Sequence, residues 1–473
     1  MEIVGRYSEQ QTLQRYFESD KPEFVAVYGR RRVGKTFLIR EYFKKRFSFY
    51  ISGIGNATKQ EQLENFNKTL TLYGKKQYPM VETWMEAFRQ LINLLENNKK
   101  KGKKVLFFDE LPWFDTPRSG FLMGLEYFWN TWASSQSNIL LIVCGSATSW
   151  IINKLFKNRG GLHNRVTHRM LVTPFNLLEC EEYFKRKRIE LSRKDIVESY
   201  MVFGGIPFYL DMFVKGLSLA QNVDKLCFTK KGELASEFSV LYSSLFKHSE
   251  NHELVIKALA KKRMGLTREE ILKETKLQGG GLTSILEELE QCNFIRSYNA
   301  YEKKTKERLY QLIDFYSLFY LNFMKDNLRK DGDFWKSLIG SAKHRAWSGY
   351  AFEQVCMQHA DQIKQKLGIS GVVTYSAAWR SKKSEPAAQV DLLIDRNDGV
   401  INLCEMKYSE NEFVIDKKTD ENLRNKRGTF IEETKTRKAV HITMLTTYGV
   451  KHNEYWNSIQ SEVTMNDLFI KSR

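Results

Sequence analysis

The sequence predicts an α/β protein organised around a parallel sheet, and three stretches carry that prediction. Residues 24–28 form a short apolar run with β-branched members, and residues 37–43 behind it have helical spacing. Residues 105–108 and 139–144 are further apolar runs of strand length. Strands of a parallel sheet are covered on both faces, so they appear as continuous apolar runs instead of alternating ones.

The loop between the first strand and its helix has the pattern G-x-x-x-x-G-K-T of a Walker A motif. Gly29 and Gly34 permit a backbone in which several N–H groups converge on phosphate. Lys35 is expected to reach the β- and γ-phosphates, Thr36 to hold Mg²⁺, and the following helix to direct its positive end at the same anion. A plain basic loop is the alternative, but it does not require a strand and a helix on either side. The predicted nucleotide-binding loop comprises Gly29, Arg30, Arg31, Arg32, Val33, Gly34, Lys35, Thr36 and Phe37.

Length and composition limit the class of protein. A chain of 473 residues predicts roughly three domains. The net charge of +18 favours a polyanionic partner, nucleic acid before an anionic membrane, with a merely basic soluble surface as the alternative. The six cysteines form no C-x-x-C pair, which indicates reduced thiols in a cytoplasmic protein without a zinc site. No signal peptide is predicted, and the longest apolar run, residues 139–144, is far too short to span a membrane.

The run at residues 105–108 ends in Asp109 and Glu110, the form of a Walker B strand. Ligands of open α/β sheets bind at the carboxyl edge of the strands, where these acids would lie. Asp109 is expected to bind Mg²⁺, directly or through water, and Glu110 to polarise the attacking water as a general base. Taken alone, the string describes only a strand end with an acidic turn. Its position downstream of a Walker A loop favours the catalytic interpretation.

Two further features are candidates for sensing the γ-phosphate. Ser146 follows the strand at residues 139–144, with Thr148 as the second choice, and helix capping is an alternative role for either hydroxyl. Arg159 and Arg165 lie in a glycine-containing segment and are candidates for an arginine finger supplied in cis or by a neighbouring subunit. A plain surface arginine is the alternative for each.

Residues 176–245 are predicted to form a helical lid on the nucleotide domain, interrupted by Gly204, Gly205 and Pro207. Residues 246–340 predict a winged helix-turn-helix followed by an aromatic helical link. Its expected helices span residues 254–261, a second helix that starts at the capping box of Thr267 and Glu270, and residues 282–291, with Gly279–Gly281 as a turn. The expected strands span residues 294–298 and 308–313.

The charges of this module oppose one another. The third helix carries Glu287, Glu288 and Glu290, which disfavour entry into a groove lined with phosphates. The wing between the two strands is basic instead; it carries Lys303, Lys304, Lys306 and Arg308. DNA binding and an intramolecular packing role therefore stay open for this module.

The last third of the chain, residues 341–473, contains a second group of ionisable residues. Asp391 lies in one expected strand, and Glu405 and Lys407 lie in the next. Facing residues of a hairpin lie close together, and residues two apart share a face. The two carboxylates are expected to hold Mg²⁺, with Glu353 from a helix completing the shell and Lys407 positioning or activating water. An ordinary charged hairpin is the alternative.

The first two thirds of the chain resemble P-loop ATPases of the AAA+/STAND type, in particular archaeal and bacterial ATPases with a helical lid and a winged helix. The resemblance rests on the Walker motifs, on Ile3-Val-Gly5-Arg6 followed by Glu9, on Gly145-Ser146, and on the Gly-Gly-Ile-Pro string that begins at residue 204. It implies an ATPase core over residues 1–175 and nucleotide contacts from Gly5 and Arg6, which match a box that contacts adenine.

Residues 343–469 resemble the PD-(D/E)xK nuclease-like domain that this ATPase family often carries. Asp391, Glu405 and Lys407 match its core triad, and Glu353 matches its helix acid. The chain departs from the pattern at Val390, which stands where the family has proline. The resemblance implies a restriction-endonuclease-like α/β fold, and it includes inactive copies.

The leading hypothesis from these features is an ATP- and Mg²⁺-dependent ATPase that acts on DNA, with a nuclease domain gated by the ATPase. The alternative is a nucleotide-dependent signalling switch in which the winged helix and the last domain bind partners without cleavage. We expect no membrane association, and we keep a homo-oligomer and a protein partner of the winged helix as candidate interactions.

Overall fold

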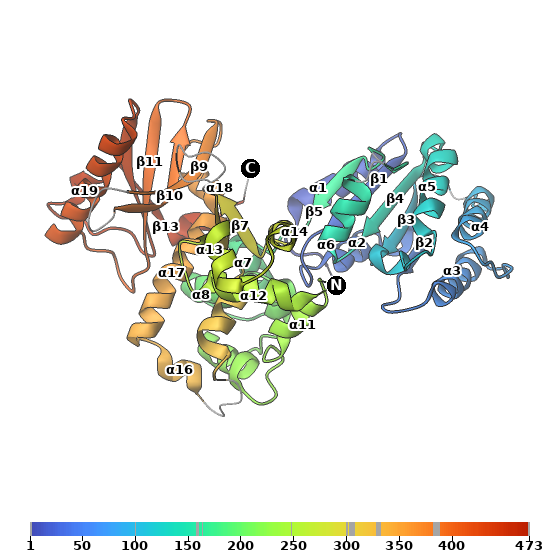
Figure 1. Cartoon of the computed structure of the whole chain (residues 1–473), viewed down its shortest axis with the longest axis horizontal. Helices are drawn as coiled ribbons and strands as arrows, with labels where there is room; N and C mark the ends of the chain where they lie inside the picture. Colours follow the sequence, from blue (N-terminus) through green and yellow to red (C-terminus); the bar gives the residue numbers. More distant parts are fainter. Residues whose placement is uncertain are drawn as a thin grey trace. The chain divides into compact units, whose positions relative to one another are not determined.

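A computed structural model of the chain describes residues 2–99, 101–157, 160–162, 164–246, 248–298, 301, 308–327, 333–381 and 388–471. The chain divides into two compact units, Met1–Pro174 and Phe175–Arg473, which appear in separate colour ranges in Figure 1. Each unit is described by itself. Among the described residues, we find no helix with the length and apolar character needed to cross a membrane.

The first unit contains a five-stranded parallel sheet with the order β2-β3-β4-β1-β5. The strands are β1 (Glu23–Tyr28), β2 (Phe47–Ser52), β3 (Lys104–Asp109), β4 (Ile139–Cys144) and β5 (His168–Leu171). The prediction of a parallel-sheet α/β core is thereby confirmed. Strand β5 was not predicted, because it lies at the edge of the sheet and only Met170 among its residues is fully buried, so its sequence lacks an apolar run.

Helices cover both faces of this sheet. They are α1 (Tyr7–Glu18), α2 (Lys35–Phe43), α3 (Lys59–Gly74), α4 (Trp84–Asn97), α5 (Phe121–Thr131) and the short α6 (Thr148–Ile151). One face packs Phe49 and Phe108 against a single apolar core shared with α3, α4 and α5. On the other face, Phe43 of α2 contacts Phe17 of α1 and Phe47 of β2. Phe47 in turn stacks on Phe107 of β3.

The second unit begins with the helices predicted as a lid. They are α7 (Leu177–Arg186), α8 (Arg193–Phe203), α9 (Pro207–Asp211), α10 (Leu219–Val223) and α11 (Glu237–Ser243). The predicted break is confirmed: Gly204 and Gly205 have φ values of 64° and 66°, and Pro207 starts α9. A Cβ atom on Gly205 would lie 2.2 Å from the carbonyl oxygen of Phe175, so the chain needs glycine there. These helices are grouped with the second unit, and their packing on the nucleotide domain stays a prediction.

A winged helix-turn-helix follows, as predicted. It comprises α12 (Ser249–Ala260), β6 (Leu266–Thr267), α13 (Arg268–Thr275), α14 (Gly279–Gln291), β7 (Ile295–Tyr298) and β8 (Leu309–Leu312). The strands form an antiparallel sheet with the order β6-β8-β7. Thr267 and Glu270 form the expected capping box. The prediction that Gly279–Gly281 forms a turn was wrong: these glycines are the first turn of α14, because the buried Leu282, Ile285 and Leu289 hold the helix despite poor glycine propensity.

The rest of the unit is a mixed sheet with the order β13-β12-β11-β10-β9. The aromatic link forms α15 (Phe315–Phe319) and a π-helical turn, Tyr320–Met324. The elements that follow are α16 (Phe334–Leu338), α17 (Ala342–Gln358), α18 (Ala360–Lys366), β9 (Thr374–Arg380), β10 (Gln389–Arg396), β11 (Val400–Lys407), α19 (Lys417–Thr434), β12 (Ala439–Thr446) and β13 (Ser461–Thr464). Strands β9 to β11 are antiparallel and β11 to β13 parallel. Helix α17 contacts β11, and α19 contacts β12 (Figure 1).

Candidate functional site

The Walker A loop leaves β1 at its carboxyl end with a close backbone contact. Gly29 has a φ of 138°, and a Cβ atom there would lie 2.3 Å from the carbonyl oxygen of Val172. Val172 also donates its N–H to the carbonyl of Tyr28 at 2.8 Å. Gly34, with a φ of 86°, precedes the first residue of α2. Glycine is therefore required at both ends of the loop for reasons of backbone geometry.

Lys35 is buried inside this loop. Its Nζ donates hydrogen bonds to the carbonyl oxygens of Gly29 and Arg30, both at 2.8 Å. The ammonium group is thereby held within the loop to which the motif assigns the phosphates. The role of Lys35 in nucleotide binding stays a prediction that this geometry fits.

The predicted magnesium ligands lie next to each other. The Thr36 hydroxyl donates to Oδ1 of Asp109 at 3.0 Å, and the N–H of Glu110 donates to the same oxygen at 3.1 Å. Burial raises the pKa of Asp109, and the neighbouring charge of Glu110 adds to the rise. A hydroxyl and a carboxylate, both oxygen donors, form the ligand pair that Mg²⁺ prefers, and a divalent cation would relieve the burial of this charge.

Glu110 and Ser146, which were predicted for separate reasons, are in direct contact. The Ser146 hydroxyl donates to Oε1 of Glu110 at 2.8 Å, and its N–H donates to Oε2 at 3.2 Å. Strand β4 lies beside β3, so the residue after β4 reaches the acid after β3. Ser146, the predicted sensor, thus holds the carboxylate of Glu110, the predicted base, in a fixed orientation.

The remaining nucleotide-site predictions have different surroundings. Arg6 is 4% exposed; it donates to the carbonyls of Val33 at 2.8 Å and Thr173 at 2.6 Å, and it pairs with Glu9 at 3.3 Å. Arg6 therefore braces the Walker A loop from behind, a contact that the sequence did not indicate. Within the loop Arg30 and Val33 are buried, whereas Arg31 and Arg32 are half-buried and Phe37 is exposed.

The two candidate arginine fingers precede β5 in the sequence. Arg159 lies outside the described residues. Arg165 is exposed in a turn, where its N–H donates to the carbonyl of Leu162 at 3.1 Å. Thr148, the alternative sensor, is fully buried at the start of α6. A finger role for either arginine stays a prediction.

The second group of ionisable residues comes together in the mixed sheet. The pairing of Leu392 with Cys404 sets Asp391 opposite Glu405 in the next register position. The register between β9 and β10 shifts between Val390 and Leu393, at the level of Asp391. Such irregularities re-aim side chains and are common next to active sites. Lys407 shares the face of Glu405, and its Nζ lies 2.8 Å from Oε1.

A second lysine, which the sequence reasoning missed, completes this cluster. Lys426 of α19 places its Nζ 2.6 Å from Oε2 of Glu405. It lies far along the chain from β11 and in a helix that was not predicted, so spacing carried no signal for it. We call Glu353, Asp391, Glu405, Lys407 and Lys426 the carboxylate cluster.

The acids of the carboxylate cluster have unequal proton affinities. Burial, followed by the charge of Asp391, raises the pKa of Glu353 to about 8. Burial also raises the pKa of Asp391. Burial would also raise the pKa of Glu405, but the positive charges of Lys426 and Lys407 outweigh burial and lower that pKa. Burial would lower the pKa of Lys407, but the negative charge of Glu405 outweighs burial and raises that pKa.

Whether the cluster suits a metal follows from its donors. Asp391, Glu405 and Glu353 supply carboxylate oxygens, as Mg²⁺ requires. Among the residues that the structure describes, however, no group of three or more His, Cys, Asp or Glu side chains is already arranged to hold a metal ion. Lysines occupy both oxygens of Glu405. The donor set fits Mg²⁺, and binding would require the lysines to release Glu405.

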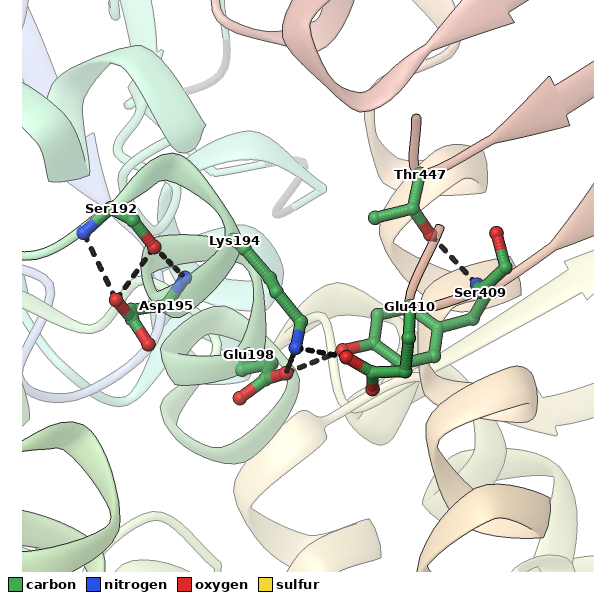
Figure 2. A network of polar contacts seen from close by, with 8 residues as sticks. Ser192, Lys194, Asp195, Glu198, Ser409, Glu410 and Thr447 are labelled. Carbon is green, nitrogen blue, oxygen red and sulfur yellow. Dashed lines mark hydrogen bonds and ion pairs between the residues drawn. The ribbon is translucent and has the colours of Figure 1, made fainter. Parts of the chain in front are cut away.

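A polar network joins the end of β11 to α8, as Figure 2 shows. Lys194 contacts Glu410 at 2.5 Å and Glu198 at 3.4 Å. Tyr408, directly after Lys407, donates its hydroxyl to Glu198, and burial with the charge of Glu198 raises its pKa. The N–H of Ser409 donates to Thr447 at 3.0 Å. The strand end that carries Lys407 is thus tied to one of the predicted lid helices.

The winged helix uses several of its charges internally. On α14, Glu288 lies 2.7 Å from Nε2 of His252, and Glu290 lies 3.5 Å from Arg308. Beyond β7, the N–H of Tyr301 donates to the carbonyl of Ala378 in β9 at 3.0 Å. Its ring lies 5.4 Å from that of Phe430 in α19. Lys303, Lys304 and Lys306 lie outside the described residues.

Comparison with known proteins agrees with this geometry. Residues 3–213 match a family model described as an ATPase domain predominantly from Archaea. The chain is 24% identical over 413 residues to an uncharacterised protein of Methanocaldococcus jannaschii. The aligned region covers 86% of this chain and 88% of the relative. A Walker-type ATPase of Pyrococcus abyssi is similar in fold, with a TM-score of 0.50, 21% identity, and coverage of 67% of this chain and 96% of that one. The chain therefore carries a P-loop ATPase domain and is an ATPase.

Proposed function

We propose that this ATPase acts on DNA and that its carboxylate cluster is a Mg²⁺-dependent nuclease site gated by the ATPase. One observation carries the proposal: Asp391 and Glu405 face each other across two strands, with Lys407 on the same face. Acids and a lysine so arranged are suited to phosphodiester hydrolysis. The net charge of +18 supports a polyanionic substrate.

Each proposed site has its own residues for Mg²⁺. At the nucleotide, Thr36 and Asp109 would hold the ion, and Glu110 would orient and deprotonate the attacking water. In the carboxylate cluster, Asp391, Glu405 and Glu353 would hold it. Bound there, Mg²⁺ supplies charge to stabilise the phosphodiester as it is cleaved. Lys407 would donate a hydrogen bond to the attacking water.

The gating would act through the helices that separate the two sites in the sequence. Tyr408 and Glu410 are hydrogen-bonded and ion-paired to α8, and the ATPase family model extends into this helix. A shift of α8 that depends on nucleotide would therefore move the strand end that bears Lys407. The free and buried cysteines support a cytoplasmic location.

The test uses the full chain with Mg²⁺, with and without ATP, on supercoiled, linear and single-stranded DNA. We expect cleavage that ATP modulates, that EDTA abolishes and that Lys407→Ala reduces at least a hundredfold. Lys451→Ala is the matched control, because Lys451 is an exposed lysine of the same domain outside the cluster. Uncut DNA under all conditions, or equal cutting by Lys407→Ala, would refute nuclease activity.

A second candidate is a nucleotide-dependent switch in which the winged helix and the last domain bind protein partners without cleavage. The docking of Tyr301 on β9 and α19 favours it, because it commits the start of the wing to packing inside the chain. Salt-insensitive binding to a protein, with no DNA affinity at low salt, would favour this candidate.

Self-association, tested by sedimentation with and without ATP, would supply the neighbour that an arginine finger at Arg165 needs in trans.

A further inference from the structure

We infer that two arginines of the winged helix complete the substrate site of the carboxylate cluster: the exposed Arg263 binds the phosphodiester backbone, and the buried Arg296 supplies further positive charge near Asp391. The inference rests on the proposed nuclease function and extends it: the site is shared by two modules of the chain. The winged helix would then contribute side chains to the substrate site of the cluster, instead of binding a DNA groove elsewhere.

Arg296 reaches the cluster from strand β7. Its Nη2 donates to Oε1 of Gln354 at 2.9 Å, and its Nε and Nη2 donate to Oε1 of Gln311 at 2.9 and 2.6 Å. Gln354 follows Glu353 in α17. Burial lowers the pKa of Arg296, and the negative charge of Asp391 acts against this. The guanidinium is therefore held by neutral partners, the amides of Gln311 and Gln354 and the sulfur of Met357. Among the described residues, none of the hydrogen bonds of Arg296 goes to a carboxylate.

Arg263 approaches from the turn between α12 and β6. Its guanidinium carbon lies 5.3 Å from the ring centre of Tyr350, which precedes Glu353 by one turn of α17. The Tyr350 hydroxyl donates to the carbonyl of Arg263 at 3.4 Å. The positive charge of Arg263 lowers the pKa of Glu353, although burial dominates at that acid. Unlike Arg296, Arg263 is exposed, so its guanidinium is accessible to a ligand.

The balance of charge indicates an anionic ligand. Four cations lie near the three acids: Lys407 and Lys426 contact Glu405, and Arg263 and Arg296 lie beside helix α17, which carries Glu353. The cations of this site therefore outnumber its carboxylates. A site for Mg²⁺ alone gains nothing from additional cations, whereas a phosphodiester backbone does. The planar guanidinium also matches phosphate oxygens in a two-pronged geometry.

The position of the wing supports the same conclusion. Tyr301 ties the chain after β7 to β9 and α19, and Arg296 ties β7 itself to Gln354 of α17. Glu288 and Glu290, which would repel DNA, are engaged by His252 and Arg308.

The test measures binding of a fluorescent DNA duplex by anisotropy, in EDTA to prevent cleavage, over a range of KCl concentrations. We expect Arg263→Gln to weaken binding about tenfold at low salt. It should also reduce the slope of log K against log salt by about 0.9, the value for one lost phosphate contact. Lys262→Gln is the matched control, because Lys262 is the adjacent exposed cation and pairs with Glu270 at 2.6 Å; its slope should equal that of wild type.

Arg296 is tested with Arg296→Gln, which removes the buried charge, beside Arg296→Lys, which keeps it. We expect weaker DNA binding and slower cleavage for Arg296→Gln than for Arg296→Lys, measured below the melting temperature of both variants, with unchanged ATP hydrolysis. Both variants should melt at a lower temperature than wild type, because neither replaces all the hydrogen bonds to Gln311 and Gln354. Slopes for Arg263→Gln equal to wild type would overturn the inference. If wild type then still cuts DNA and Lys407→Ala does not, the proposed nuclease stands while the arginine site fails. Wild type that neither binds nor cuts DNA would overturn both.

Discussion

The candidate nucleotide site and the carboxylate cluster treat their acids differently. Asp109 is buried next to a second acid, Glu110, and its hydrogen-bond partners are neutral. Glu405 instead has a lysine on each oxygen. In the function that we propose, the first site would depend on a cation that arrives with the nucleotide, whereas the second carries its own cations and would have to rearrange them to accept a metal. Equivalent substitutions should therefore have unequal effects at the two sites.

The largest effect is expected at Lys35. Lys35→Ala removes the ammonium held inside the Walker A loop, so affinity for a fluorescent ATP analogue should fall by more than about a hundredfold. Lys45→Ala, which alters an exposed lysine after α2, is the control and should bind as wild type does. Retained affinity in Lys35→Ala would show that the loop does not bind phosphate through this residue.

Glu110→Gln separates binding from turnover. The amide keeps the size of the side chain and a hydrogen bond to Ser146, but it cannot accept a proton from water. We expect unchanged ATP affinity and a kcat about 10²- to 10⁴-fold lower, the usual contribution of a general base. The rate of phosphate release under saturating ATP measures this kcat. Equal rates of hydrolysis for Glu110→Gln and wild type would refute the role of Glu110.

Glu353→Gln tests whether the buried acid of the carboxylate cluster keeps its proton in the folded chain. In EDTA, the folded chain holds the Glu353 proton up to a pKa of about 8, above the ordinary value of 4.5. Stability should therefore fall as the pH rises from about 4.5 to 8, by at most ~1.4 kcal/mol per pH unit. Thermal unfolding at pH 5.5, 6.5 and 7.5 measures this.

The glutamine variant should lose that part of the pH dependence and gain stability relative to wild type as the pH rises. Parallel pH profiles for the two proteins would mean that Glu353 is ionised in the folded chain. The comparison between the sites would then fail, because both would present acids that await a metal.

The smallest effect is expected at Tyr408. Tyr408→Phe removes the hydroxyl bonded to Glu198, which should cost about 1 kcal/mol in urea unfolding. In the proposed nuclease it should also reduce the stimulation or inhibition by ATP more than the cleavage rate without ATP. Tyr375→Phe, at an exposed position on β9, is the control, and equal ATP response in both variants would exclude α8 as the route.

The sequence alone predicted most of the residues that the structure brings together in the candidate nucleotide site. The strand at residues 24–28, the glycines of its loop and the acids after β3 are adjacent in the chain or lie at strand ends, where local rules apply. Ser146 was found for the same reason, since the residue after a strand lies at the edge of the sheet. The hairpin of Asp391, Glu405 and Lys407 followed from strand alternation.

Only the tertiary structure decided which distant side chains join these groups. Lys426, Arg263, Arg296 and Tyr408 come from a helix, a turn, a wing strand and a strand end that no period or spacing relates to Glu405. Arg6 braces the Walker A loop for a similar reason: its partners Val33 and Thr173 are remote in sequence. Motifs are local and can be recognised in a chain, whereas the balance of charge around a buried acid is a sum over everything that packs on it.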